Sequence, residues 1–538
     1  MNRREILQST MKGLGAAAIG PRAVAAQKGR STHAGNRPNI LQIMADQQIW
    51  DSIANRSVCR TPNINRLIDQ GMLFNRSYTP CPLCCPARAM LLSGAYHWHN
   101  GVFNQIHSSP SVRRDMYPDV VTYSQRLRDA GYRLGYVGKW HASFTRTPYD
   151  FGYHEVGAPN AYNSKLLENI QYYDERVKGE SGGYELDAKS LKKSMQRVVP
   201  VRQFAWPGSE PFTMWGYMEG EEENTNLHGT FETAINMLGR FSRQEAPWLL
   251  EVHTIEPHDP YMPLKSYLDH YDPRSIEVPK SFYDTFEGKP GMHRREADSW
   301  APVTEDDYRE SRAHYYAYCE MVDTQVGRLL DELDRTGQAN NTMVVFTSDH
   351  GDMVGAHRMW IKGWQPYEEC HRIPLAIRWP DRINPGSLSD NLVQTQDLAY
   401  TYMDATGAGK LPFEDGRSLT PLFDQPARSD WPDHILGAFY GGEFLYTQRI
   451  VFTERYKYVF NGFDMDECYN LESDPDELQN HIENPGYTRI VDDLRARLYE
   501  LMTQYEDPFG DHRQNRISIG HPPNRYCSPR YLPKGKRM

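Results

Sequence analysis

Short apolar runs, each ending at polar or charged residues, recur along the chain and alternate with amphipathic stretches. The apolar runs cover residues 39–45, 134–137, 248–254, 343–347 and 375–378. The amphipathic stretches between them cover residues 62–71, 120–130 and 311–333. Buried strands that alternate with helices are typical of an α/β fold with a parallel sheet. The pattern therefore predicts a large, mostly parallel or mixed sheet sandwiched by helices.

Four of the predicted strands end at residues whose side chains can carry chemistry. In chain order, these residues are Asp46 and Gln47, Lys139 and His141, His258, and Asp349 and His350. In open α/β sheets, ligands bind outside the carboxyl ends of the strands. The sequence therefore predicts a single active site at that edge of the sheet.

Two regions depart from this alternation of predicted strands and helices. Residues 142–245 are rich in Tyr, Glu and Gly, which predicts an insertion over the site. The elements predicted after residue 416 are a β-hairpin over 443–460, a loop over 464–477 and a helix over 491–505. We therefore expect a catalytic domain of residues 37–425 and a small C-terminal α+β domain of residues 430–538 with an irregular tail.

The first 26 residues are not typical of a folded domain. Arg3 and Arg4 precede a weakly apolar stretch, and residues 23–25 form an A-x-A cleavage site. These features predict a twin-arginine (Tat) export signal in residues 1–26, with a disordered basic terminus as the alternative. No other run approaches the ~20 apolar residues of a membrane-spanning helix. We expect a bacterial protein that is periplasmic or secreted and has no membrane span.

Composition excludes several classes of protein. Hydrophobic residues make up 39% of the 538 residues and charged residues 24%, which is ordinary for a globular chain. Lys and Arg number 60 against 70 Asp and Glu, and this mild net charge of −10 predicts no nucleic-acid partner. Eight cysteines are too few for a disulfide scaffold, yet Cys81, Cys84 and Cys85 lie within five positions.

Three interpretations of these clustered cysteines are open from the residues alone. Cys81 and Cys84 could form a redox pair, but no thioredoxin-like βαβ pattern surrounds them. They could form half of a zinc site, but the chain has no second Cys-x-x-Cys. In the third interpretation Cys84 begins a helix, where exposed amides and the charge of Arg88 favour an anionic group or a nucleophile.

The third interpretation meets a known pattern. Cys84-x-Pro86-x-Arg88, followed by Leu-Leu-Ser-Gly, resembles the signature of the formylglycine-dependent sulfatases of the alkaline phosphatase superfamily. Further blocks in the order of that family are Gly138–His141, Pro257–Pro260, Ser348–Gly351, Lys362 and Tyr367–Pro374. The resemblance covers roughly residues 37–507 and implies an alkaline-phosphatase-like fold.

The resemblance implies a modified nucleophile and a metal. Cys84, and not Cys85, would be oxidised to Cα-formylglycine by a formylglycine-generating enzyme, and Arg88 and Lys139 would hold its hydrate. The implied metal ligands are Asp46, Gln47, Cys84, Asp349 and His350. Hard oxygen ligands suit Ca²⁺, which is the expected divalent cation, or Mg²⁺. The imidazole of His350 leaves Mn²⁺ and Zn²⁺ as further alternatives.

The resemblance also implies roles for the remaining site residues. Asp349 would accept the proton of the nucleophilic hydroxyl. His258, helped by Lys362, would protonate the leaving alcohol, and His141 would take the proton of the second hydroxyl. Gln47 departs from the usual Asp of the family and lowers the negative charge of the metal site by one, a feature of choline-sulfatase-like and phosphonate-monoester-hydrolase-like branches.

The expected function is hydrolysis of an organic sulfate ester, on a sulfated glycan, with release of sulfate. The alternatives are a phosphonate monoester or phosphodiester hydrolase, a choline-sulfatase-like enzyme, and a non-catalytic sulfoglycan-binding protein. His97 and His99 follow the predicted nucleophile helix and are candidate substrate contacts, with buried polar packing as the alternative.

Overall fold

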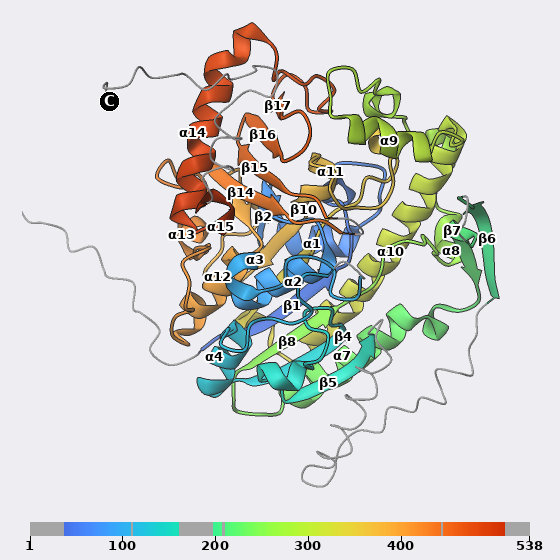
Figure 1. Ribbon diagram of the computed structural model, residues 1–538. Coiled ribbons are helices and arrows are strands. Elements are labelled where there is room, and N and C mark those ends of the chain that lie inside the picture. The colour runs from blue at the N-terminus through green and yellow to red at the C-terminus, as the bar shows by residue number, and fades with distance from the viewer. Residues whose placement is uncertain (1–36, 109–110, 161–196, 207–209, 443–444, 512–538) are drawn as a thin grey trace, which may run out of the picture. The chain divides into compact units, whose positions relative to one another are not determined.

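The computed structural model describes residues 37–108, 111–160, 197–206, 210–442 and 445–511, all in one unit of the chain (Figure 1). The predicted export signal, residues 1–26, lies outside the described residues. So do residues 161–196 of the predicted insertion and the predicted tail after residue 511. Among the described helices, none is long and apolar enough to cross a membrane.

The main sheet has eight strands. They are β1 (Asn39–Ala45), β2 (Met72–Phe74), β4 (Arg133–Lys139), β5 (Glu155–Asn160), β8 (Trp248–His253), β9 (Thr342–Ser348), β11 (Leu375–Arg378) and β12 (Ser387–Ser389). Their order across the sheet is β12-β2-β11-β9-β1-β8-β4-β5. β9, β1, β8, β4 and β5 run parallel, whereas β11 is antiparallel to β9 and β2. The sheet is mixed and mostly parallel, as predicted, and all five predicted strands are confirmed.

The central strand β1 explains the continuous apolar runs. All seven of its residues are buried. Ile40 and Met44 pack into the core on one face of the sheet, and Leu41 and Ile43 pack into the core on the other. A strand covered on both faces needs apolar side chains at both alternating sets of positions.

Helices provide that cover on both faces (Figure 1). One face packs against α2 (Cys84–Ser93), α4 (Tyr123–Asp129) and α12 (Asp397–Thr406). The other packs against α1 (Pro62–Asp69), α7 (Asn226–Phe241) and α10 (Glu305–Arg335). α10 begins before the predicted residue 311 because Thr304 caps it. The Thr304 hydroxyl accepts the Asp307 N–H, and the Asp307 carboxylate accepts the Thr304 N–H.

A second, antiparallel sheet lies near the C-terminus. Its strands, in spatial order, are β14 (His434–Phe439), β15 (Gln448–Thr453), β16 (Tyr456–Asn461) and β17 (Glu467–Asn470). The helix α14 (Thr488–Gln504) shares its core. The predicted hairpin and C-terminal helix are confirmed by β15, β16 and α14. The predicted loop over 464–477 is wrong in its middle, because β17 pairs with β16 there. The sequence pattern did not reveal this short buried strand because its end residues are polar.

The described chain also has shorter strands and α-helices. The short strands are β3 (Ser77–Tyr78), β10 (Arg372–Ile373) and β13 (Val393–Gln394), which form one sheet, and the paired β6 (Arg197–Phe204) and β7 (Phe212–Glu219). The short helices are α3 (His97–Asn100), α8 (Lys265–Leu268), α9 (Gly291–Ser299), α11 (Glu368–His371), α13 (Thr420–Asp424) and α15 (Pro508–Asp511).

The helix α2 lies between the two sheets, and all ten of its residues are buried. Ala89 and Leu92 pack into the core of the main sheet, and Met90 packs into the core that includes the C-terminal sheet. The helix ends at Gly94, whose φ of 68° is the left-handed conformation that terminates many helices. Packing on both sides therefore fixes the position of the first residue of this helix, Cys84.

Candidate active site

The predicted site residues meet where four parallel strands end. β9, β1, β8 and β4 are neighbours in the sheet, so their carboxyl ends lie along one edge. Gln47 and His141, each two residues after the end of one of these strands, have φ values of 67° and 52°. Residues other than Gly rarely adopt this left-handed backbone, and where they do, it is concentrated at functional sites. The chain therefore turns sharply at this edge.

Cys84 is the first residue of α2 and points into this cluster. Its Sγ lies 3.2 Å from Nε2 of His350 and 3.8 Å from Oδ1 of Asp46. The side-chain amide of Gln105 donates to the same sulfur at 3.7 Å. Strands β1 and β9 and helix α2 thus place Asp46, His350 and Cys84 in contact, although they are far apart in the sequence.

Two buried cations neutralise the two aspartates of the cluster. Nε of Arg88 donates to Oδ2 of Asp349 at 2.9 Å, and Nη2 of Arg88 lies 3.5 Å from Oδ2 of Asp46. Nζ of Lys139 forms an ion pair with the same Asp46 oxygen. Burial and Cys84 oppose ionisation of Asp46, but Lys139 and Arg88 help to hold its pKa at about 2. Asp46 in turn raises the pKa of Lys139 against the effect of burial.

Gln47, His258 and Lys362 form a second group beside this cluster. Nζ of Lys362 donates to Oε1 of Gln47 and also contacts Nε2 of His258. The Gln47 amide donates to Oδ1 of Asp259 at 3.0 Å. Burial is the largest single influence and lowers the pKa of His258, but the Asp259 and Asp46 carboxylates and Cys84 together raise it above its ordinary value. Because Lys362 contacts the Gln47 oxygen, ligation of a metal by Gln47 stays a prediction.

His141 is buried two residues after β4. Burial and the charge of Lys139 lower its pKa to about 3, so its imidazole is neutral at pH 7. Its ring stacks on that of His107, with the ring centroids 5.1 Å apart. A neutral imidazole beside Cys84 can accept a proton there.

Four of the predicted metal ligands are arranged to hold a divalent cation. The ligand atoms of Asp46, Cys84, Asp349 and His350 lie within 4.8 Å of one another, and all four residues are buried. Two carboxylates and an imidazole are donors that divalent cations accept. The residues present therefore fit the metal that the sequence predicts.

His97 and His99 contact other parts of the chain. The ring of His97 is buried, 5.7 Å from that of Tyr440. His99 pairs with Oδ2 of Asp415 at 2.6 Å and stacks on Phe413 at 4.3 Å. These contacts account for both side chains by packing, and substrate binding by them stays a prediction.

Several contributors to the site were not predicted. Gln105 contacts the Cys84 sulfur from a loop without periodic pattern, so no sequence signal identifies it. Asp259 lies inside the Pro257–Pro260 block, where its position beside His258 is a usable signal. His253 ends β8 and lies 3.3 Å from Nη1 of Arg88. Its place at a strand end is the same signal that identified Asp46.

Comparisons with known proteins agree with this geometry. The family model described as "Sulfatase" matches residues 38–408, and the one described as "N-sulphoglucosamine sulphohydrolase, C-terminal" matches residues 355–504. An arylsulfatase of Clostridium perfringens is 27% identical over 90% of this chain and 98% of its own length. An N-acetylglucosamine-6-O-sulfatase of Bacteroides thetaiotaomicron is 24% identical over 90% of this chain and 89% of its own.

Solved structures share the fold. The crystal structure of a phosphonate monoester hydrolase of Agrobacterium radiobacter superimposes with a TM-score of 0.70 at 22% sequence identity. The match covers 87% of this chain and 96% of that chain. The large mixed sheet with flanking helices and the smaller C-terminal sheet are thus an established architecture.

Proposed function

We propose that residue 84 acts as the nucleophile of this enzyme after conversion to formylglycine. The chain belongs to the sulfatase family and is therefore a sulfuric ester hydrolase. The surroundings of Cys84 carry this proposal. Burial opposes ionisation of the thiol, yet Lys139, Lys362 and His350 hold its pKa well below the usual 9.0. A pocket that stabilises negative charge on this side chain would also stabilise an oxygen anion of an aldehyde hydrate.

A divalent cation, with Ca²⁺ expected, is part of the proposal. Asp46, Asp349 and His350 would hold it, and when bound it would supply positive charge to a sulfate oxygen and to the nucleophile. The ion pairs of Arg88 and Lys139 with the same aspartates keep both cations at the site. They would then face the anionic oxygens of a sulfate ester, where preorganised positive charge lowers the barrier.

Two histidines supply the proposed proton transfers. His258 lies between Asp259 and Lys362, and its raised pKa suits a group that gives a proton to the leaving alcohol. His141 is neutral and buried, which suits a group that accepts a proton from residue 84. The two groups differ because Asp259 faces the first imidazole and the Lys139 cation lies near the second.

A sulfated carbohydrate is the proposed substrate class. The Bacteroides relative is named for action on N-acetylglucosamine-6-O-sulfate groups, and the C-terminal family model is named for a sulphoglucosamine enzyme. The twin arginines at Arg3 and Arg4 support export to the periplasm or beyond, where polymeric glycans are met. Maturation by a formylglycine-generating enzyme would precede that export, because Tat substrates cross the membrane folded.

Mass spectrometry of residue 84 tests the nucleophile. Trypsin cleaves after Arg76 and Arg88, so residues 77–88 form one peptide. After co-expression with a formylglycine-generating enzyme, we expect an aldehyde at residue 84 and a thiol at residue 85. Cys84→Ala should abolish hydrolysis of an aryl sulfate, whereas the matched control Cys85→Ala should retain it. An active enzyme with an unmodified thiol at residue 84 would contradict the proposal.

A substrate comparison tests the ester class. The rates on an aryl sulfate and on the matched aryl phosphonate monoester should favour the sulfate. Release of sulfate from a panel of sulfated glucosamine derivatives should exceed release from choline sulfate. Preference for the phosphonate would instead support the phosphonate hydrolase that Gln47 left open, and preference for choline sulfate would contradict the glycan assignment.

A further inference from the structure

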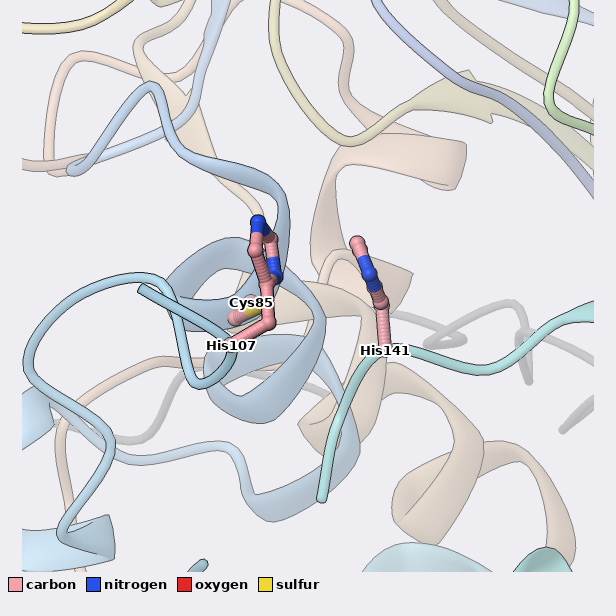
Figure 2. A group of neighbouring side chains, drawn as sticks. All are labelled: Cys85, His107 and His141. Atoms are coloured by element: carbon pink, nitrogen blue, oxygen red, sulfur yellow. The ribbon is translucent and has the colours of Figure 1, made fainter. Parts of the chain in front are cut away.

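A second group of metal-ligating side chains lies beside the nucleophile. The ligand atoms of Cys85, His107 and His141 lie within 4.8 Å of one another. Figure 2 shows the two imidazole rings facing each other, with the Cys85 side chain next to His107. Cys85 and His141 are buried and His107 is exposed. A cation could therefore reach this group from solvent through His107.

The three residues come from separate segments. Cys85 is the second residue of α2, His107 lies in the loop after α3, and His141 follows β4. Tertiary packing alone therefore assembles one thiol and two imidazoles. Cys84 faces the carboxylates of the catalytic cluster, while the next residue of the same helix faces this group.

We propose that Cys85, His107 and His141 form a binding site for a thiophilic divalent cation, Zn²⁺, distinct from the catalytic metal cluster. A thiolate with two imidazoles is a zinc ligand set, whereas Ca²⁺ and Mg²⁺ select oxygen ligands. Zinc binds sulfur at about 2.3 Å and nitrogen at about 2.0–2.1 Å, which places two ligands of a tetrahedral ion roughly 3.5 Å apart. The ligand atoms lie within 4.8 Å of one another, so the exposed His107 would move inward to reach that separation.

Zinc binding at this group displaces one proton. Formation of the sulfur–zinc bond releases that proton to solvent, and each imidazole donates a nitrogen lone pair. Three protein ligands leave the fourth position of a tetrahedral ion for water.

Occupation of this site inhibits the hydrolase. This consequence rests on the proposed function, in which His141 accepts a proton from residue 84. A His141 nitrogen bound to Zn²⁺ cannot accept that proton, and the added positive charge disfavours protonation of the ring further. The catalytic ion would thus be held mainly by carboxylates, and the inhibitory ion at the adjacent site by a thiolate and two imidazoles.

Cobalt binding tests the site without reference to activity. Co²⁺ replaces Zn²⁺, and a thiolate bound to it gives a sulfur-to-cobalt charge-transfer band. The full-length Cys84→Ala protein, which lacks the neighbouring thiol, should show this band, and addition of Cys85→Ser should remove it. Addition of the exposed His107→Ala instead should weaken Co²⁺ binding by at least about tenfold, since even supporting residues of metal sites contribute that much. Absence of the band in Cys84→Ala, or its persistence after Cys85→Ser, would overturn the proposal.

Zinc titration of turnover tests the inhibition. With saturating Ca²⁺ present, micromolar Zn²⁺ should inhibit the mature enzyme, and a chelator followed by Ca²⁺ should restore turnover. Relative to its own zinc-free turnover, His107→Ala should require at least about tenfold more zinc for the same fractional inhibition. His270→Ala, which removes an exposed histidine elsewhere, should respond as the wild type does. Equal inhibition of wild type and His107→Ala would show that zinc acts elsewhere and would refute the inhibitory site.

These two experiments separate the zinc site from the proposed function. If residue 84 proves not to be the nucleophile, the cobalt band of Cys85 is unaffected. If the cobalt band is absent, two predictions of the proposed function are unaffected. These are the conversion of Cys84 to formylglycine and the loss of aryl sulfate hydrolysis in Cys84→Ala.

Discussion

Two buried carboxyl groups on adjacent strands have opposite electrostatic behaviour. Asp46 directly follows β1, with Lys139 and Arg88 beside it, and its pKa is about 2 despite burial. Glu251 lies within β8, where the hydroxyl of Tyr123 and the ring of His253 contact it. Burial raises the pKa of Glu251 to about 7.

The difference teaches that cations, and not burial, define the site. Both carboxyl groups are shielded from solvent to the same degree, with 0% and 1% of their surfaces exposed. The ends of the parallel strands gather Lys139, while α2 brings Arg88 to the same point. The middle of the sheet face instead receives aromatic side chains from the covering helices, such as Tyr123 of α4. Buried charge is therefore tolerated at the strand ends and opposed beneath them.

The largest expected effect comes from removing the paired carboxylate. Asp46→Asn should lower turnover at least ~100-fold, because it removes a predicted metal ligand and the partner of Lys139. Leaving that lysine buried without its partner should also cost about 3–5 kcal/mol of stability. Aryl sulfate turnover and urea unfolding measure the two effects.

The matched control for Asp46→Asn is an exposed pair. Asp269→Asn breaks the ion pair with Lys265 on the surface, which should change stability by less than about 1 kcal/mol. If Asp46→Asn left turnover within about tenfold of wild type, the contrast between Asp46 and Glu251 would have no catalytic meaning.

The next effect concerns Glu251 and pH. The folded protein keeps the Glu251 proton up to about pH 7, whereas the unfolded chain releases it near the ordinary 4.5. The folded state binds more protons in this window, so the contribution of Glu251 to stability falls as pH rises through it. Relative to wild type, Glu251→Gln should gain on the order of 3 kcal/mol between pH 4.5 and pH 8. Urea unfolding of both proteins across this range measures the difference, and a constant difference would contradict the raised pKa.

Removal of the proposed catalytic metal should lower the free energy of unfolding by slightly less than the change predicted for Glu251→Gln. A ligand at 100 times its dissociation constant stabilises the folded state by about 2.7 kcal/mol. Ca²⁺ should therefore raise the unfolding midpoint of the chelated wild type. Asp349→Asn should abolish most of this gain, whereas Cys85→Ala should retain it. Full calcium stabilisation of Asp349→Asn would place the ion elsewhere.

The smallest expected effect concerns the hydrogen bond between Tyr123 and the protonated Glu251. The Tyr123 hydroxyl donates a hydrogen bond to Glu251, and this bond lowers the pKa of Glu251. Tyr123→Phe removes the bond, so the pKa of Glu251 should rise further. The loss of this hydrogen bond should cost about 1 kcal/mol, while turnover should change little. Unfolding and turnover of the variant measure these effects. A loss of turnover as large as that of Asp46→Asn would show that the neutral core takes part in catalysis.

Much of the fold, and the placing of several site residues at strand ends, could be predicted from local pattern. β1 and β11 have the bounds of their predicted runs, because a strand buried on both faces leaves an uninterrupted apolar signal. The strand β17 was missed because it is short and ends in polar residues, Glu467 and Asn470. The start of α10 was missed because its first turn is acidic and solvated rather than apolar.

The sequence alone determined which residue types follow each strand and that Cys84 begins a helix with Arg88 one turn later. Parallel strands must end at one edge, so the meeting of Asp46, Asp349 and His350 could also be foreseen. Only the tertiary structure decided the partners of each group. The contact of Lys362 with Gln47 joins residues 315 positions apart, and no local pattern encodes it. The grouping of Cys85 with His107 and His141 has the same cause, because strand order and helix packing bring these segments together.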